Sequence, residues 1–313
     1  MLGKTAGGLY WMFRYIERSE NIARLILAGQ RIALTRGSRA SDEWAAIVAT
    51  AGVDAGFRKK YDGYDGADVV DFLLRDMDNG SSVLSVIDAA RNNARMVRTA
   101  LTREVWEAVN ECWMKLRDVL AKPVAERDLS DVLAVIRQRN AFVRGALHGT
   151  MARNDAYDFA RLGTFVERAD STARILDVKY YVLLPSTVAV GTSIDNVQWE
   201  VILRSVSAEG AFRYIHGDSS APRQIAEFVI LDGRLPRSLK FCVRKIVENL
   251  GYLEDEYGAR HPCHDAADAI AKRFAEADID GVFEQGLHEF LQSFLSDNNA
   301  LGGMIETAYR FSK

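Results

Sequence analysis

The stretch "YIERSENIARLI", residues 15–26, has the hydrophobic period of an α-helix and belongs to a longer pattern of the same kind. From Leu9 to Leu34, apolar residues recur at spacings of three and four, with charged residues between them. This spacing is typical of an amphipathic helix, because residues three and four apart share one face. Comparable patterns cover most of the chain, including Val83 to Leu120 and Val197 to Ile215, without a series of alternating strands. The sequence therefore predicts an all-α fold.

The few prolines agree with this prediction. A proline inside a helix removes a hydrogen bond and breaks or kinks the helix, so prolines mark helix boundaries. The sequence has five, and each falls where a helical pattern begins or ends: Pro123, Pro185, Pro222, Pro236 and Pro262.

The opening stretch returns 150 positions later as "FVERADSTARIL", residues 165–176. Other residues repeat in the same order, at offsets of 155 and 156: Trp44 and Trp199, Phe57 and Phe212, Phe72 and Phe228, Asp76 and Asp232, and Ser82 and Ser238. A long, nearly constant offset indicates duplication of one unit, and such copies usually pack about a pseudo-two-fold axis. We therefore predict two helical units, residues 1–152 and 153–313, packed as one globular body.

The repeated helix carries the main candidate site. Glu17, Glu20 and Arg24 form a narrow polar stripe, and Arg18 lies at its border. With their counterparts in the second copy, the candidates are Glu17, Arg18, Glu20, Arg24, Glu167, Arg168, Asp170 and Arg174. Two interpretations remain open. The stripes either face solvent, where an ion pair is worth about 0.3–0.5 kcal/mol, or they line a shared groove as a buried ionic cluster or ligand-binding site.

Composition excludes some classes of function. The chain has a net charge of -3 and a pI near 6.0, so nothing in its overall charge favours binding to nucleic acid or anionic membranes. Its three cysteines are odd in number and far apart, which is typical of reduced thiols in the cytoplasm. The N-terminal residues show no signal-peptide pattern.

Other motifs with known chemistry are weak, and no cofactor or metal ion is predicted. The sequence lacks a phosphate-binding G-x-x-x-x-G-K-[ST] loop and a G-x-S-x-G nucleophile elbow. "HPCHD", residues 261–265, contains metal-binding residue types, but it lies where a helix should begin and lacks a second ligand pair. "LPRSLK", residues 235–240, could place helix amides and Arg237 near an anion, which makes Arg237 a weaker candidate for an anion site, but an ordinary helix start is the stronger explanation of this stretch.

Four stretches carry a resemblance to a known family. They are "GGLYWMFRYIERSENIAR" (7–24), "RLGTFVERADSTAR" (161–174), "FLLRDMDNGSSVLS" (72–85) and "FVILDGRLPRSLKFC" (228–242). They resemble the alpha-E family, a helical domain named for its Glu-Arg motif and typically found in tandem. That motif falls on Glu17-Arg18 and Glu167-Arg168. Glu20 is replaced by the shorter Asp170 in the second copy, so the two sites need not be equivalent.

The resemblance also implies a biological context. Members of the family are associated, through neighbouring genes, with peptide synthesis or modification. Those genes encode circularly permuted ATP-grasp ligases, a transglutaminase-like protein and an N-terminal-nucleophile hydrolase. Three functions follow as hypotheses: an accessory protein that binds and positions a ligase or its peptide substrate, an enzyme that uses the duplicated Glu and Arg residues for acid-base or divalent-metal chemistry, and a purely structural scaffold.

Overall fold

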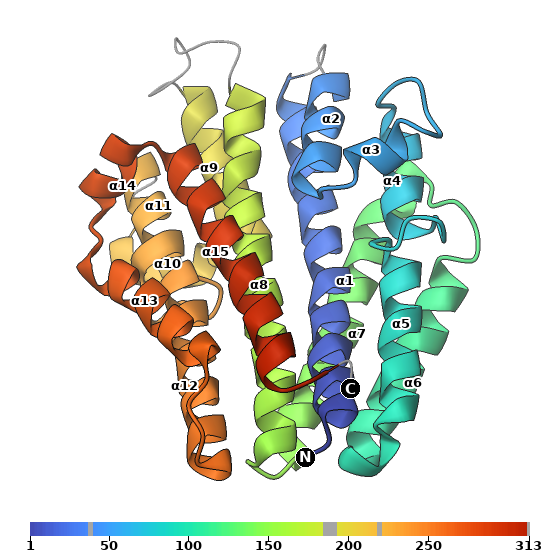
Figure 1. Ribbon diagram of the computed structural model, residues 1–313. Coiled ribbons are helices and arrows are strands. Elements are labelled where there is room, and N and C mark those ends of the chain that lie inside the picture. Colours follow the sequence, from blue (N-terminus) through green and yellow to red (C-terminus); the bar gives the residue numbers. More distant parts are fainter. Residues whose placement is uncertain (37–39, 184–192, 218–220, 312–313) are drawn as a thin grey trace.

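The computed structural model describes residues 1–36, 40–183, 193–217 and 221–311, and all regular elements within these ranges are helices. This confirms the predicted all-α fold. Figure 1 shows two long helices at the centre and a group of shorter helices on each side of them.

The two central helices are α1 (Gly3–Arg36) and α8 (Asp155–Leu183), which contain the two copies of the motif. They begin at the same end of the molecule, as shown by the amino group of Met1, which lies 3.4 Å from the carboxylate of Asp155. They then run side by side in the same direction (Figure 1). The motif residues of α1 and α8 therefore lie at the same height along the two helix axes.

The remaining helices divide between the two sides of this central pair. On the side of α1 lie α2 (Ala40–Thr50), α3 (Asp54–Phe57), α4 (Gly66–Leu74), α5 (Val83–Met96), the 3₁₀ turn η1 (Arg98–Ala100), α6 (Arg103–Val119) and α7 (Glu126–Thr150). On the side of α8 lie α9 (Ser193–Ser205), α10 (Glu209–His216), α11 (Pro222–Leu231), α12 (Leu239–Tyr257), α13 (Pro262–Glu276), α14 (Ile279–Gln285) and α15 (Leu287–Ala308). Helix α1 packs against α5 and α7, whereas α8 packs against α12 and α15.

Helix boundaries follow local chemistry. Pro222 and Pro262 are the first residues of α11 and α13, where the missing amide hydrogen costs no helical bond. Pro123 and Pro236 lie in the turns before α7 and α12. Pro185 lies outside the described residues.

Two long periodic stretches are each interrupted in the structure. The stretch from Val83 to Leu120 is divided by η1 into α5 and α6. The stretch from Val197 to Ile215 is divided between α9 and α10 at Ser207, whose φ of 55° lies in the left-handed region. A residue in that conformation ends a helix. Apolar spacing alone did not predict either break, because hydrophobic residues continue across both.

The aromatic residues that repeat in sequence form part of the core. All six are buried: Trp44, Phe57, Phe72, Trp199, Phe212 and Phe228. Phe57 and Phe72 meet edge to face with ring centroids 5.2 Å apart, and Phe212 and Phe228 do so at 5.5 Å. Large apolar residues that repeat in register usually pack in the core, as these six do.

The close approach of α1 and α8 requires a glycine. A Cβ atom on Gly163 would overlap the main-chain carbonyl of Tyr10 on the neighbouring helix. Backbone atoms cannot rotate away as a flexible side chain can. We expect Gly163→Ala to lower the free energy of unfolding by about 1–3 kcal/mol, measured by urea denaturation. The matched control is Gly251→Ala on α12, where a Cβ meets no atom within 4 Å. That variant should be neutral or gain up to about 1 kcal/mol, and equal effects of the two substitutions would contradict the packing argument.

Candidate functional site

Glu17 lies at the centre of an ionic network between α1 and α8. Arg168 donates two hydrogen bonds to its carboxylate, from Nε and Nη2, each at 2.9 Å. Arg237 lies 3.1 Å away and Arg144 lies 3.3 Å away. The Glu17 side chain is 1% exposed, so this carboxylate is surrounded by guanidinium groups and shielded from water.

Glu20, one turn further along α1, belongs to the same cluster. It accepts hydrogen bonds from Arg24 at 2.7 and 3.0 Å and from Arg237 at 2.6 Å, and it also contacts Arg144. Arg144 comes from α7, and Arg237 comes from the turn that precedes α12. Residues distant in sequence thus complete this cluster, which we call the closed cluster: Glu17, Glu20, Arg24, Arg144, Arg168 and Arg237.

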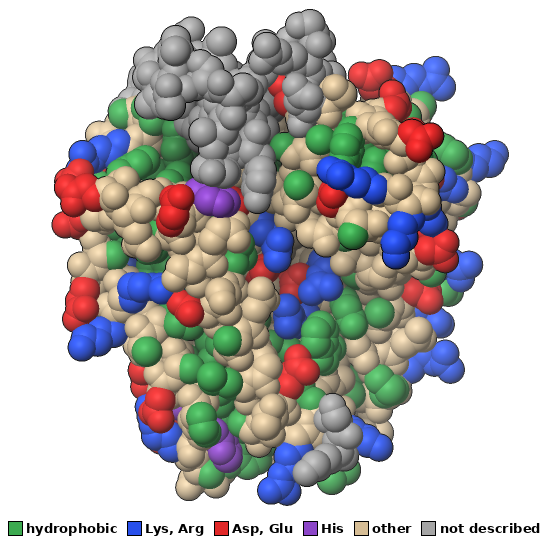
Figure 2. All heavy atoms as spheres, turned by 45° about the horizontal axis from the view of Figure 1, so that its top comes forward, with side chains coloured by type: hydrophobic (Ala, Val, Ile, Leu, Met, Phe, Trp, Pro, Cys, Tyr) green, Lys and Arg blue, Asp and Glu red, His purple; other side chains and the backbone are tan. Residues whose placement is uncertain are grey.

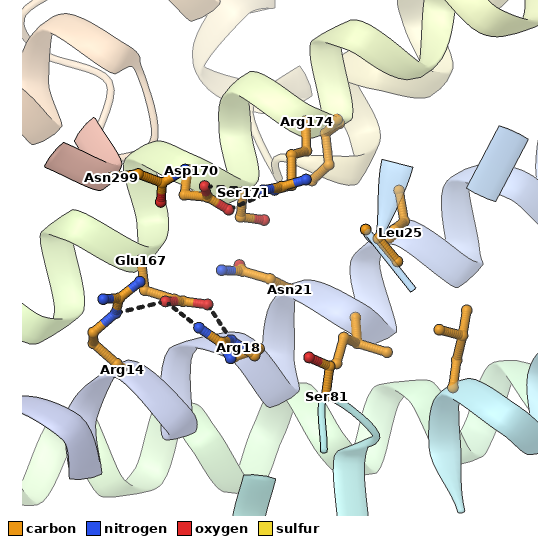
Figure 3. A pocket seen from close by; sticks show the side chains of 15 residues that line it. Arg14, Arg18, Asn21, Leu25, Ser81, Glu167, Asp170, Ser171, Arg174 and Asn299 are labelled. Atoms are coloured by element: carbon orange, nitrogen blue, oxygen red, sulfur yellow. Dashed lines mark hydrogen bonds and ion pairs between the residues drawn. The ribbon is translucent and has the colours of Figure 1, made fainter. Parts of the chain in front are cut away.

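Glu167 on α8 forms the reciprocal contact. Arg18 donates to it from Nε at 2.5 Å and from Nη2 at 3.0 Å, while Arg14 donates at 2.8 Å. The Glu-Arg dipeptides of the two helices therefore exchange partners, with Glu17 paired to Arg168 and Glu167 paired to Arg18. Figure 3 shows the Glu167 carboxylate held between the two arginines of α1.

The outer arginines also make corresponding contacts. Arg24 donates to the main-chain oxygen of Ser205, and Arg174 donates to that of Thr50. Arg174 also pairs with Asp170 at 2.7 Å, as Arg24 pairs with Glu20. Each motif helix is thereby tied to the end of a helix on the opposite side of the molecule, α9 for Arg24 and α2 for Arg174.

Burial and the neighbouring arginines shift the pKa values of the glutamates in opposite directions. Burial alone raises the pKa of a carboxyl group, because it disfavours the charged form. For Glu17 this effect is outweighed by Arg168, Arg237 and Arg144, and its pKa falls below the ordinary value. The pKa values of Glu20 and Glu167 are also lowered, by Arg237 and by Arg18 respectively, against the same effect of burial. All three glutamates are therefore ionised at neutral pH.

All eight residues singled out in the sequence lie in this region. Seven of them join the two motif helices or their neighbours through the contacts above, and in these contacts Asp170 pairs only with Arg174 on its own helix. Arg14, Arg144 and the role of Arg237 were not foreseen. Arg237 is 7% exposed and its partners are the protein's own carboxylates. Burial lowers its pKa to about 10, partly offset by Glu17 and Glu20. Arg14 could have been found, since it lies one helical turn before Arg18 on the same face.

A pocket of about 210 Å³ opens beside Glu167, next to the closed cluster. It is lined by residues of α1, α8, α4 and α15 and of the segments after α2 and before α5. Figure 3 shows Arg18 and Asn21 reaching into it from α1, opposite Asp170 and Arg174 of α8. In the space-filling view of Figure 2, basic and acidic side chains gather in the middle of the face, between the two groups of helices.

The comparisons with known proteins agree with the helical fold and with the presence of the Glu-Arg motif. The sequence model of Alpha-E, described as a predicted α-helical domain with a conserved ER motif, matches residues 1–309. The chain belongs to the Alpha-E family. In this Alpha-E protein the two Glu-Arg dipeptides of the central helices are the mutually paired residues described above, with both glutamates buried.

Two curated relatives are the uncharacterized proteins Mb2597 of Mycobacterium bovis and MT2643 of Mycobacterium tuberculosis. Each is 22% identical to the Alpha-E chain over 317 aligned positions, which cover 95% of this chain. The chain spans about a third (35%) of the length of these relatives. No solved structure is significantly similar to it.

The "HPCHD" segment of the Alpha-E chain forms the start of α13. His264 accepts a hydrogen bond from the backbone of His261 through Nδ1, and its Nε2 lies 3.1 Å from the carbonyl oxygen of Leu250. Asp265 is exposed and pairs with Arg260. Within the described ranges, no three His, Cys, Asp or Glu side chains are grouped so that they could hold a metal ion.

The cysteines of the Alpha-E chain are free thiols in the core. Burial raises the pKa of Cys112 and of Cys242 to about 12 and that of Cys263 to about 11. The thiolate is the reactive form of cysteine, so these thiols are unreactive at neutral pH. Among the helices that the structure describes, none is long and apolar enough to cross a membrane.

The ionic network predicts how stability depends on pH. The folded-state pKa values of Glu17, Glu20 and Glu167 lie below the ordinary value of 4.5. As pH falls below 4.5, the unfolded chain therefore binds protons before the folded chain does, and stability is lost. We expect the melting temperature to fall steeply below that pH in circular dichroism scans. The Glu17→Gln variant should show a weaker fall, and a parallel fall in both proteins would contradict the assignment.

Proposed function

We propose that this Alpha-E protein is a non-catalytic partner in peptide synthesis or modification, which binds and positions a circularly permuted ATP-grasp ligase or its peptide substrate. The observation that carries this proposal is the saturation of the motif glutamates. Glu17, Glu20 and Glu167 are buried, and each is bound by at least two arginines. They hold two helices together beside an open pocket.

This arrangement weighs against the enzymatic alternative. A general acid or base works best when its pKa lies near the working pH. The pKa values of these three glutamates are lowered instead. A divalent ion would need carboxylate oxygens that can face it, whereas these oxygens already face guanidinium groups. An ionised carboxylate held by arginines suits a structural or binding role.

The identity of the partner rests on the family resemblance and on one further fact. The match occupies about a third of the mycobacterial relatives, so this region is joined there to additional sequence. In these relatives the matched region is covalently joined to further sequence. This is consistent with a region that, in the present protein, works together with a separate partner protein. The buried thiols are consistent with a location in the cytoplasm, and a transglutaminase-like protein is a second candidate partner.

We further propose that residues 1–152 and 153–313 are copies of one unit. The reciprocal contacts of Glu17 with Arg168 and of Glu167 with Arg18 support this proposal. So do the N-caps of α5 and α12, because Ser82 and Ser238 accept a backbone hydrogen bond in the same way. The scaffold interpretation accounts for these contacts but gives no role to the pocket between them.

Co-expression with a circularly permuted ATP-grasp ligase, the class of partner that the family resemblance implies, tests the proposed function. We expect the two proteins to elute together in size-exclusion chromatography and ligation of peptide to require both. The ligase alone and this chain alone are the controls. Separate elution, together with ligation that is independent of this chain, would refute the partner role. Turnover of peptide by this chain alone would refute its non-catalytic character.

A further inference from the structure

The ionic network between the two motif helices carries an excess of positive charge. Within the described part of the chain, it joins seven arginines to four acids: Arg14, Arg18, Arg24, Arg144, Arg168, Arg174 and Arg237, with Glu17, Glu20, Glu167 and Asp170. Four of these arginines are less than 10% exposed. Charges removed from water are normally paired. Three positive charges in excess therefore favour an anion nearby.

The pocket beside Glu167 is where such an anion can enter. Arg18 and Arg174 line it from opposite helices, and their side chains are 25% and 32% exposed. They are less buried than Arg24 and Arg168, their counterparts in the closed cluster, which are 9% and 10% exposed. Part of each guanidinium is thus left for a ligand.

Asn21 supplies an independent indication of what the pocket binds. Asn21 is 6% exposed, and its Oδ1 accepts a hydrogen bond from Arg237 at 3.2 Å. Its Nδ2 is buried without a hydrogen-bond partner among the described residues. Figure 3 shows this side chain extending from α1 into the space between Glu167 and Ser171. A buried donor without an acceptor is costly, and an oxyanion in the pocket would supply that acceptor.

One difference between corresponding turns contributes to the opening of the pocket. Arg237 directly precedes the N-cap Ser238 of α12 and fills the space beside Glu17 and Glu20. Ser81 directly precedes the N-cap Ser82 of α5, and this short side chain lines the pocket beside Glu167. One side of the network is therefore filled by the protein's own guanidinium, whereas the other side has room for a ligand.

The other wall of the pocket is apolar. It is formed by Ile22, Leu25, Leu73 and Ile175. A volume of about 210 Å³ corresponds to roughly seven water molecules at about 30 Å³ each. This is enough for one carboxylate with a short aliphatic group. A second hollow of about 340 Å³ adjoins it and shares Arg174 and Asn299, which provides space for the rest of a longer ligand.

We propose that this pocket binds the C-terminal carboxylate of a peptide together with its last, aliphatic side chain. Arg18, Arg174 and the amide of Asn21 hold the carboxylate, the apolar wall receives the side chain, and the adjoining hollow receives the preceding residues. This inference rests on the proposed role in peptide synthesis or modification. It makes this chain the part of the system that presents the carboxyl end of the substrate.

Isothermal titration calorimetry of the purified chain, residues 1–313, tests this site. The probes are acetyl-Gly-Gly-Leu with a free carboxylate, the same peptide as its C-terminal amide, and inorganic phosphate. We expect the acid to bind, the amide to bind at least tenfold more weakly, and phosphate to compete only weakly. Absence of binding, equal binding of acid and amide, or displacement by phosphate at the concentration of the peptide would each overturn the proposal.

Two variants and a control locate the site. Asn21→Asp keeps an acceptor for Arg237 but puts a negative charge into the pocket, and Ser81→Arg fills the pocket as Arg237 fills the closed cluster. Each should weaken binding of the acid at least tenfold while the melting temperature is maintained. The control, Asn92→Asp, makes the same charge change at an exposed position on α5 outside the pocket lining. Unchanged affinity in both folded pocket variants would overturn the assignment.

The outcomes separate this proposal from the proposed function. If the chain elutes with the ligase and supports ligation but binds no peptide, only the pocket assignment fails. If it binds the peptide acid but neither elutes with the ligase nor supports ligation, the partner role fails and the pocket stands.

Discussion

Replacing Phe72 or Phe228 by alanine is expected to lower the free energy of unfolding by about 3–5 kcal/mol. Both side chains are 2% exposed, and each packs edge to face on a second buried ring, Phe57 or Phe212. Truncation removes the apolar surface that each ring buries, leaves a cavity and ends the ring contact. Urea denaturation followed by far-UV circular dichroism measures the change.

The matched control is Phe142→Ala on α7, whose ring is 52% exposed. It should change stability by less than about 1 kcal/mol, because most of its surface already contacts water. If Phe72→Ala and Phe228→Ala melt like the control, the repeated aromatic residues do not form the core. A large effect of only one of them would show that the two sides of the molecule contribute unequally.

The fold could be predicted from sequence because its main signals are local. Hydrophobic spacing over 15–26 and its return at 165–176 identify the two central helices, and prolines mark several boundaries. The break at Ser207 was missed because it depends on a left-handed backbone conformation in a residue other than glycine. Such a conformation is held by tertiary packing, and the spacing of apolar residues does not predict it.

The candidate site could be predicted only in part, for a related reason. Helical spacing places Glu20 and Arg24 together, as it does Asp170 and Arg174. It does not show that Arg144 of α7 and Arg237, beside α12, reach the same glutamates, because these contacts span more than 120 positions. A shared groove between the motif helices was one of two open interpretations, but the position of the pocket on the side of Glu167 was not predicted, since it depends in part on a serine at position 81, where the corresponding turn has an arginine.

Glu17→Gln is expected to lower the free energy of unfolding by about 3–5 kcal/mol, the cost of removing one partner from a buried ion pair. Glutamine has nearly the same shape, so the loss arises from charge. Arg168, Arg237 and Arg144 would share one carboxylate fewer, and an amide NH₂ would face a guanidinium that can only donate. Glu167→Gln should act in the same direction through Arg14 and Arg18.

The control and a double variant decide what this loss means. Glu107→Gln breaks an exposed pair with Arg103, whose side chains are 50% and 80% exposed, and should cost less than about 1 kcal/mol. The double variant Glu17→Gln with Arg168→Gln should lose less unfolding free energy than the sum of the losses of the two single variants. Each single variant leaves the charge of the remaining partner without its counter-charge, whereas the double variant removes both charges of this pair. Strict additivity would contradict the direct pairing. Loss of melting temperature and of ligase support together would indicate an ionic core, whereas loss of ligase support alone would place Glu17 in binding.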